Sequence, residues 1–179
     1  MKGAVLKVML IAIATLFVQA AAAALFIESG IYNIGADDHH TKLTLAVIEQ
    51  LREQSIAVRD DAIPPQAQTI QAGAARYAAL CAGCHLAPGM TKSDIRPGLY
   101  PHPPNLAQGE VQDPQRAFWI IKHGIKMTAM PAWGKTLDDA AIWDLVAFVR
   151  AMPSLTPESY RHLTADAAAG APPVARETR

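Results

Sequence analysis

Two cysteines stand three positions apart, and a histidine directly follows the second, in the segment Cys81-Ala82-Gly83-Cys84-His85. This spacing is typical of a covalent haem attachment site. Each thiol can add across one vinyl group of the porphyrin, and the adjacent imidazole is then held where it can bind the iron. The chain has no other cysteine. We therefore expect one haem, held covalently by Cys81 and Cys84, with His85 as an axial ligand.

The same two thiols are compatible with two other kinds of site. A Cys-x-x-Cys pair can act as a redox dithiol or supply half of a zinc site. Zinc would need a second pair of ligands at short spacing, which the sequence does not offer. A redox dithiol is expected after a strand of a β-α-β unit, whereas the surrounding sequence has a helical pattern. We therefore favour haem attachment over both alternatives.

A helix over 69–80 is predicted to lead into the cysteine segment. The stretch 86–110 that follows is rich in proline and glycine, and it predicts loops rather than long regular structure. The next helix opens with Asp113 as N-cap and ends at Gly124. The last strong helix follows a cap at Thr136 or Asp138 and carries apolar side chains at helical spacing.

A long apolar run opens the chain. Val8 to Ile27 comprises 20 residues, of which only Thr15 and Gln19 are polar. Twenty helical residues span about 30 Å, the thickness of the hydrocarbon core of a bilayer. Lysines precede the run and acidic residues follow it, which predicts a cytoplasmic N-terminus with the remainder outside. We predict an uncleaved transmembrane anchor over 1–27, and a cleaved signal peptide is the alternative.

The segment 28–66 is predicted to connect the anchor to the following domain. It begins with a loop that contains His39-His40, continues as an amphipathic helix over about 42–59, and ends in a linker at Pro64-Pro65. We expect the helix to pack on the next domain or on the membrane surface. Adjacent histidines in a loop point in different directions, so solvated side chains are favoured there over a metal site.

The composition argues against nucleic acid binding, because the formal net charge is zero and the sequence contains no basic tract. The acidic excess lies in 28–66, whereas 67–153 is slightly basic. Four lysines of this domain either steer an acidic protein partner or form an ordinary solvated surface; these are Lys92, Lys122, Lys126 and Lys135.

Taken in order, these motifs resemble those of class I c-type cytochromes, over about 69–153. The shared motifs are G-x-x-x-Y at Gly73 to Tyr77, C-x-x-C-H at Cys81 to His85, P-x-L at Pro104 to Leu106, M-P-x-W at Met130 to Trp133, and an aromatic C-terminal helix. The paired C-x-x-C-H and M-P-x-W motifs are highly specific, whereas the helix motifs alone would be weak. The front of the chain is similar to that of membrane-anchored bacterial cytochromes c.

The resemblance implies an all-α cytochrome c fold around one covalently bound haem c, preceded by a transmembrane helix and an outer amphipathic helix. It implies that Met130 is the second axial ligand, and that the carbonyl of Pro104 accepts a hydrogen bond from the other ring nitrogen of His85. Trp133, with Pro131, is expected to frame the loop that presents Met130. The other candidate ligands on that side are Met90, His102, His123 and Met127.

The function implied by the resemblance is electron transfer and not enzymatic turnover, because an iron with two protein ligands has no open position for a substrate. The expected partners are the membrane and redox proteins such as a respiratory complex, an oxidase or a dehydrogenase, with no small-molecule substrate. Two alternatives stay open. The chain is a haem subunit of a larger oxidoreductase complex, or its iron has an open site that binds a small gas or peroxide.

The predicted organisation has four parts: an anchor over 1–27, the connecting region 28–66, a haem domain over 67–153 and a tail over 154–179. The tail lacks a periodic apolar face, so we expect it to be largely disordered. The expected location is the bacterial inner membrane with the haem domain in the periplasm. A soluble periplasmic protein is the alternative if the first segment is cleaved.

Overall fold

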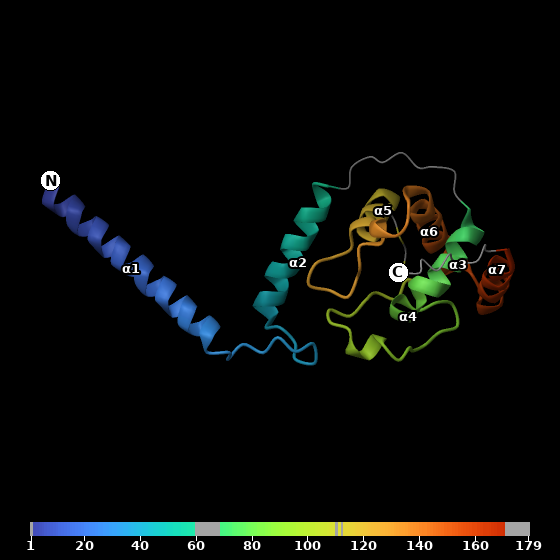
Figure 1. Cartoon of the computed structure of the whole chain (residues 1–179), viewed down its shortest axis with the longest axis horizontal. Coiled ribbons are helices and arrows are strands. Elements are labelled where there is room, and N and C mark those ends of the chain that lie inside the picture. The colour runs from blue at the N-terminus through green and yellow to red at the C-terminus, as the bar shows by residue number, and fades with distance from the viewer. Residues whose placement is uncertain (1, 60–68, 110, 112, 171–179) are drawn as a thin grey trace, which may run out of the picture. The chain divides into compact units, whose positions relative to one another are not determined.

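The computed structural model describes residues 2–59, 69–109, 111 and 113–170, and in this part of the chain all regular secondary structure is helical, without a strand (Figure 1). This confirms the predicted all-α fold class. The elements, in order, are α1 (Lys2–Glu28), α2 (Lys42–Ala57), α3 (Ile70–Leu80), α4 (Ala82–His85), η1 (Arg96–Gly98), α5 (Pro114–His123), η2 (Trp133–Lys135), α6 (Asp139–Ala151), η3 (Met152–Ser154) and α7 (Pro157–Gly170).

The chain divides into two units, Met1–Asp38 and His39–Arg179. The first unit consists of α1 and the loop after it. Among the described residues, only α1 contains a segment, Gly3–Glu28, that is long and apolar enough to cross a membrane, and the mean hydropathy reaches 2.4 over an 18-residue window of it. Its large apolar side chains are exposed along the whole helix. A membrane anchor and a signal sequence both meet these criteria.

Helix α2 opens the second unit. Thr41 caps it, because the backbone N–H of Thr44 donates to the Thr41 hydroxyl at 3.2 Å. The side of α2 that packs on the domain carries Ile56, which is 2% exposed. Three other apolar residues of α2 are exposed, namely Leu43, Val47 and Leu51. The predicted linker at Pro64-Pro65 lies outside the described residues.

Helices α3 and α6 form the centre of the second unit and cross at Gly73. A Cβ atom on Gly73 would lie 2.1 Å from the backbone oxygen of Asp144, so only glycine allows this approach. Next to the crossing, the rings of Tyr77 and Phe148 pack with their centroids 5.2 Å apart. Asp144 joins the two helices further, because its carboxylate accepts a hydrogen bond of 2.7 Å from the N–H of Thr69 and pairs with Arg76 at 2.9 Å.

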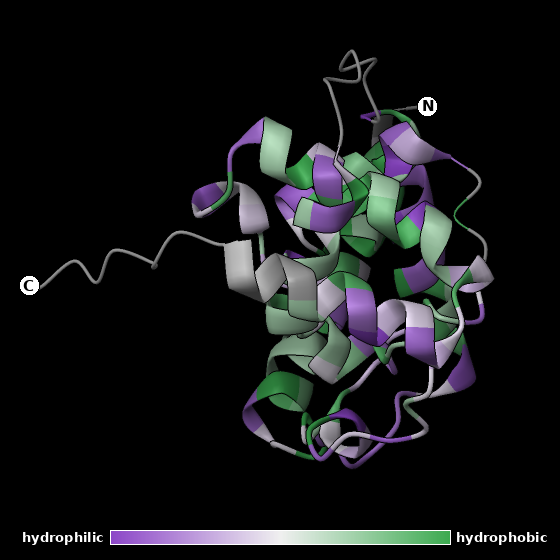
Figure 2. Ribbon diagram, turned by 90° about the vertical axis from the view of Figure 1, so that its right-hand side faces the viewer, coloured by the Kyte–Doolittle hydropathy of each residue, from purple (hydrophilic) through white to green (hydrophobic). Residues whose placement is uncertain are grey.

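Helix α5 packs on the other side of α6. The carboxylate of Asp113 caps it by accepting from the N–H groups of Gln115 and Arg116 at 2.9 and 3.1 Å, as the sequence predicted. Phe118 of α5 stacks on Trp143 of α6 with ring centroids 4.6 Å apart. Hydrophobic and hydrophilic residues alternate along the helical ribbons, as expected for helices that bury one face (Figure 2).

Helix α7 corrects the prediction for the tail. The expectation of a largely disordered 154–179 is wrong for Pro157–Gly170, which forms a helix that packs on α3 (Figure 1). The hydroxyl of Thr156 accepts from the N–H of Ser159 at 3.1 Å and so caps the first turn. Tyr160 is only 9% exposed, and its ring lies 6.2 Å from that of Phe148. A single buried aromatic residue therefore anchors a helix that has little apolar periodicity of its own.

Candidate functional site

The cysteine segment forms a tight helical turn directly after α3. The N–H of Cys81 donates to the carbonyl of Tyr77, and the N–H of His85 donates to the carbonyl of Cys81, both at 2.9 Å. The turn ends at Leu86, which has a φ of 61°. The hydroxyl of Tyr77 donates to the carbonyl of Leu86 at 2.6 Å. The side chains of Cys81, Cys84 and His85 therefore come from a rigid corner rather than from a loose loop.

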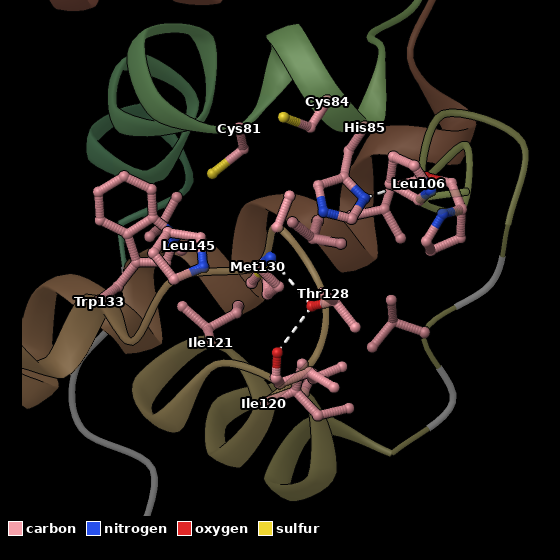
Figure 3. Close-up of a pocket in the computed structure, with 18 of the residues that line it drawn as sticks. Cys81, Cys84, His85, Leu106, Ile120, Ile121, Thr128, Met130, Trp133 and Leu145 are labelled. Atoms are coloured by element: carbon pink, nitrogen blue, oxygen red, sulfur yellow. Dashed lines mark hydrogen bonds between the residues drawn. The ribbon is translucent and has the colours of Figure 1, made fainter. Parts of the chain in front are cut away.

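These three side chains open into a cavity of about 710 Å³. Figure 3 shows Cys81, Cys84 and His85 at the α3–α4 corner on one side of the cavity, and Met130 on the segment opposite. Most of the remaining wall is apolar, including Leu99, Leu106, Ile120, Ile121, Ile125, Leu145 and Val149. The volume lies within the range of about 300–1,000 Å³ that is typical of cavities for cofactors and other small molecules.

His85 is held in one orientation. Its Nδ1 lies 3.0 Å from the carbonyl oxygen of Pro104, and its own carbonyl accepts from the N–H of Leu106 at 3.1 Å. Because a carbonyl only accepts, Nδ1 carries the proton and the lone pair is at Nε2. Burial lowers the pKa of His85, with a further lowering from the charge of Arg96, while the hydrogen bond to Pro104 opposes the shift. The imidazole is therefore kept neutral, the form that binds a metal.

The loop that carries Met130 is closed by its own hydrogen bonds. The N–H of Met130 donates to the hydroxyl of Thr128 at 3.0 Å, and that hydroxyl donates to the carbonyl of Ile125 at 2.7 Å. The N–H of Ile125 in turn donates to the carbonyl of Met130 at 3.2 Å. Gly124 allows the loop to close, because it has a φ of +65° and its Cβ would lie 2.6 Å from the backbone carbon of Pro131.

The five candidate ligands opposite His85 lie in different places. Met130 and His102 line the cavity that contains the cysteines. Met127 and His123 line a neighbouring cavity instead, and Met90 is absent from both. Trp133, which was expected to frame the Met130 loop, also lines the cysteine cavity. Met130 and His102 therefore share a cavity with His85, whereas Met127, only three residues before Met130, does not.

The groups in this cavity fit a covalently bound haem. Two thiols, an imidazole nitrogen and a thioether sulfur face largely apolar walls, which suit a flat, hydrophobic macrocycle. Burial raises the pKa of the Cys81 thiol to about 12, with an added contribution from Cys84. Among the described residues, no group of three or more His, Cys, Asp or Glu side chains could hold a metal ion. The pair His39-His40 packs around the ring of Tyr100 instead.

A comparison with known proteins agrees with this chemistry. Residues 68–149 match the family model described as cytochrome C oxidase, cbb3-type, subunit III. This segment is a class I c-type cytochrome domain. No curated protein and no solved structure matches the chain. The family implies covalently bound haem c, and its chemistry is haem-based electron transfer.

The cytochrome domain has a wall that the motifs did not predict. Glu49 and Arg52 of α2, which precedes the matched segment, also line the haem cavity. Glu53 of α2 forms an ion pair with Arg116 of α5 and a second one with Arg52 at 3.3 Å. The sequence indicated that α2 is a helix, but helical periodicity alone does not tell which face meets the haem cavity.

Proposed function

We propose that the chain is a mono-haem electron carrier whose iron is bound by His85 and Met130. Cys81 and Cys84 hold the haem through thioether bonds, and Pro104 and Trp133 support the two axial ligands. The observation that carries this proposal is that Cys81, Cys84, His85 and Met130 line one largely apolar cavity.

The protein supplies geometry and electrostatics to this chemistry. The haem takes up and releases one electron at a time. The carbonyl of Pro104 fixes the tautomer of His85 and increases its basicity as a ligand. A thioether ligand and an apolar cavity raise the reduction potential relative to two histidine ligands. If His85 and Met130 both bound the iron, no open position would remain for a substrate.

We infer that the partners are membrane respiratory or dehydrogenase complexes on the periplasmic side. Two features support this placement: the apolar helix α1 at the N-terminus and the family match to an oxidase subunit. The same match favours a second candidate function, a fixed haem subunit of a larger oxidoreductase complex. Purification of the full chain in mild detergent distinguishes a free carrier from a subunit, because a subunit should co-purify with its complex.

The ligand assignment is tested by replacing Met130 and Met127 separately in the full-length haem protein. Met130→Ala should abolish the weak near-infrared band of sulfur–iron coordination and should allow carbon monoxide to bind the reduced protein. Met127→Ala should leave both properties unchanged, because its side chain is 68% exposed and lines a different cavity. If the band survived both substitutions, its sulfur would come from another methionine, such as Met90. A wild-type protein without the band would instead point to His102 as the ligand or to an iron that is open to gas or peroxide.

A further inference from the structure

A second cavity, of about 430 Å³, lies between α2, α5 and the loop that carries Met130. The motifs of the cytochrome domain do not account for it. Its walls include Ile48 and Ile56 from α2, and Trp119 and His123 from α5. Arg52, Pro101, Ile125 and Thr128 line both this cavity and the haem cavity, so the two are neighbours. Its volume falls in the lower part of the range for small-molecule sites.

Among the residues that the structure describes, the charged side chains that line this cavity are all cations. They belong to Arg52, Arg59 and Lys126. The haem cavity differs, because Glu49 and Asp113 accompany its two arginines. A group of cations in a half-enclosed space attracts an anion.

The three cations differ in how far they are neutralised. Arg52 is paired with Glu53 at 3.3 Å. Arg59 is oriented by Ser55, because its Nη1 donates to the carbonyl and the hydroxyl of Ser55 at 2.9 and 3.0 Å. Within the part of the chain that the structure describes, no ion pair involves Arg59 or Lys126. Asp60 and Asp61, which follow Arg59 in the sequence, lie outside that part.

The remainder of the wall is apolar and aromatic. Leu45, Ile48 and Ile56 come from α2, and Trp119 packs against His123 with ring centroids 4.7 Å apart. Such a wall favours a hydrocarbon or aromatic body over a small hydrated ion. An inorganic anion would leave this surface unused, and a neutral apolar molecule would leave the cations without a partner.

We propose that this cavity binds an amphiphilic anion. Arg59 and Lys126 hold one carboxylate or phosphate group. The apolar body of the ligand lies against Trp119 and against the α2 side chains Leu45, Ile48 and Ile56. Two sources can supply this chemistry, the headgroup of an anionic lipid and a soluble organic acid. The proposal depends only on the second unit of the chain and not on the axial ligands of the haem.

The test uses the full-length haem protein in phosphatidylcholine nanodiscs and measures binding of 2-naphthoate by equilibrium dialysis. The neutral analogue 2-naphthamide is the control for the apolar contribution. The double variant R59Q/K126Q should weaken naphthoate binding by about tenfold or more, because each substitution removes a charge-assisted hydrogen bond to the carboxylate of naphthoate. The matched variant K92Q/K135Q removes the same charge from lysines that line neither cavity, and it should bind as the wild type does.

A charge-conserving variant, R59K/K126R, should retain naphthoate binding, which separates the role of charge from any effect on folding. The absorption spectrum and melting temperature of each variant check that the domain is intact. The proposal is overturned if naphthamide binds as tightly as naphthoate, if K92Q/K135Q loses as much affinity as R59Q/K126Q, or if the wild type binds neither compound at millimolar concentration.

A second arm identifies the source of the anion. Part of the phosphatidylcholine is replaced by phosphatidylglycerol, and naphthoate binding is measured again. Weaker binding in wild type but not in R59Q/K126Q supports the site and assigns it to a lipid headgroup. Unchanged binding supports the same site and assigns it to a soluble organic acid. Equal weakening in both proteins shows that lipid charge repels naphthoate without occupying the cavity, and it overturns the lipid assignment.

Discussion

At the scale of single residues, Tyr77 links the haem attachment corner to the core. Its ring packs on Phe148, and its hydroxyl donates to the carbonyl of Leu86, the residue that ends the attachment turn. The same side chain lines the haem cavity. A change at Tyr77 should therefore affect stability and the position of the attached group together.

Tyr77→Phe should destabilise the haem protein by about 1–3 kcal/mol, because the buried carbonyl of Leu86 loses its partner. The variant should also be less sensitive to alkaline pH. Burial raises the pKa of the Tyr77 phenol, so the folded protein keeps this proton at pH values where the unfolded chain loses it. The resulting stabilisation is complete below about pH 10 and is lost as the pH rises further.

This prediction is checked by denaturant unfolding of both proteins over a series of alkaline pH values. The difference in unfolding free energy between wild type and Tyr77→Phe should shrink as the pH rises. A difference that stays constant across the series would show that the phenol does not titrate with unfolding.

At the scale of elements, the backbones of α3 and α6 approach each other most closely where the two helices cross at Gly73. Gly73→Ala should destabilise the protein by about 1–3 kcal/mol or more, because the added methyl group meets the backbone oxygen of Asp144, which cannot rotate away. Thermal melting measures this effect. Gly98→Ala is the matched control, since its Cβ would meet nothing within 4 Å. Equal melting temperatures for the two variants would contradict the close crossing.

Helix α7 leads to a second prediction at this scale. Tyr160→Ala should destabilise the protein by about 2–4 kcal/mol, because a largely buried aromatic ring is lost from the contact with Phe148. Tyr160→Phe keeps the ring and should be close to wild type. Denaturant unfolding of the haem protein provides the comparison. A small effect of Tyr160→Ala would mean that α7 adds little to the stability of the domain.

The sequence predicted the elements better than it predicted their contacts. Local chemistry defines the helix ends, so the caps at Asp113 and Gly124 were recognised from residue types alone. Helix α7 was missed because its anchor, Tyr160, gains its burial from Phe148, a residue of a distant segment. For the same reason, the sequence does not show which face of α2 is buried. Leu43 and Ile48 are both large apolar residues, but only tertiary packing makes Leu43 exposed and Ile48 partly buried.

For the site, the motifs predict residues that the structure brings to one cavity, but they do not predict all of its walls. The C-x-x-C-H motif is local, so it points to Cys81, Cys84 and His85 without any structure. Met127 and Met130 differ in sequence only by their neighbours, and the folded chain places them in different cavities. Arg52 lines the haem cavity because α2 packs beside it, and the sequence contains no motif that predicts this packing.

At the scale of the whole molecule, the first prediction concerns attachment to the membrane. If α1 is an uncleaved anchor, the protein should fractionate with membranes, and its intact mass should include Lys2 and the entire helix. The physical reason is the length of the helix, 27 residues, with apolar side chains along its whole surface. A soluble form that begins between Ala21 and Leu25 would instead identify α1 as a cleaved signal sequence.

The crossing of α3 and α6 also has a consequence for the order of events during biogenesis. If the chain is exported from its N-terminus, the cysteines of the attachment corner emerge before Leu145 and Val149, which complete the wall of the cavity. Until α6 emerged, α3 would have no α6 to pack against, and the thiols would face solvent. Haem attachment at this stage would act on an open chain, and closure would follow when α6 arrived. The position of the cysteines early in the domain would therefore give the haem access that the finished fold restricts.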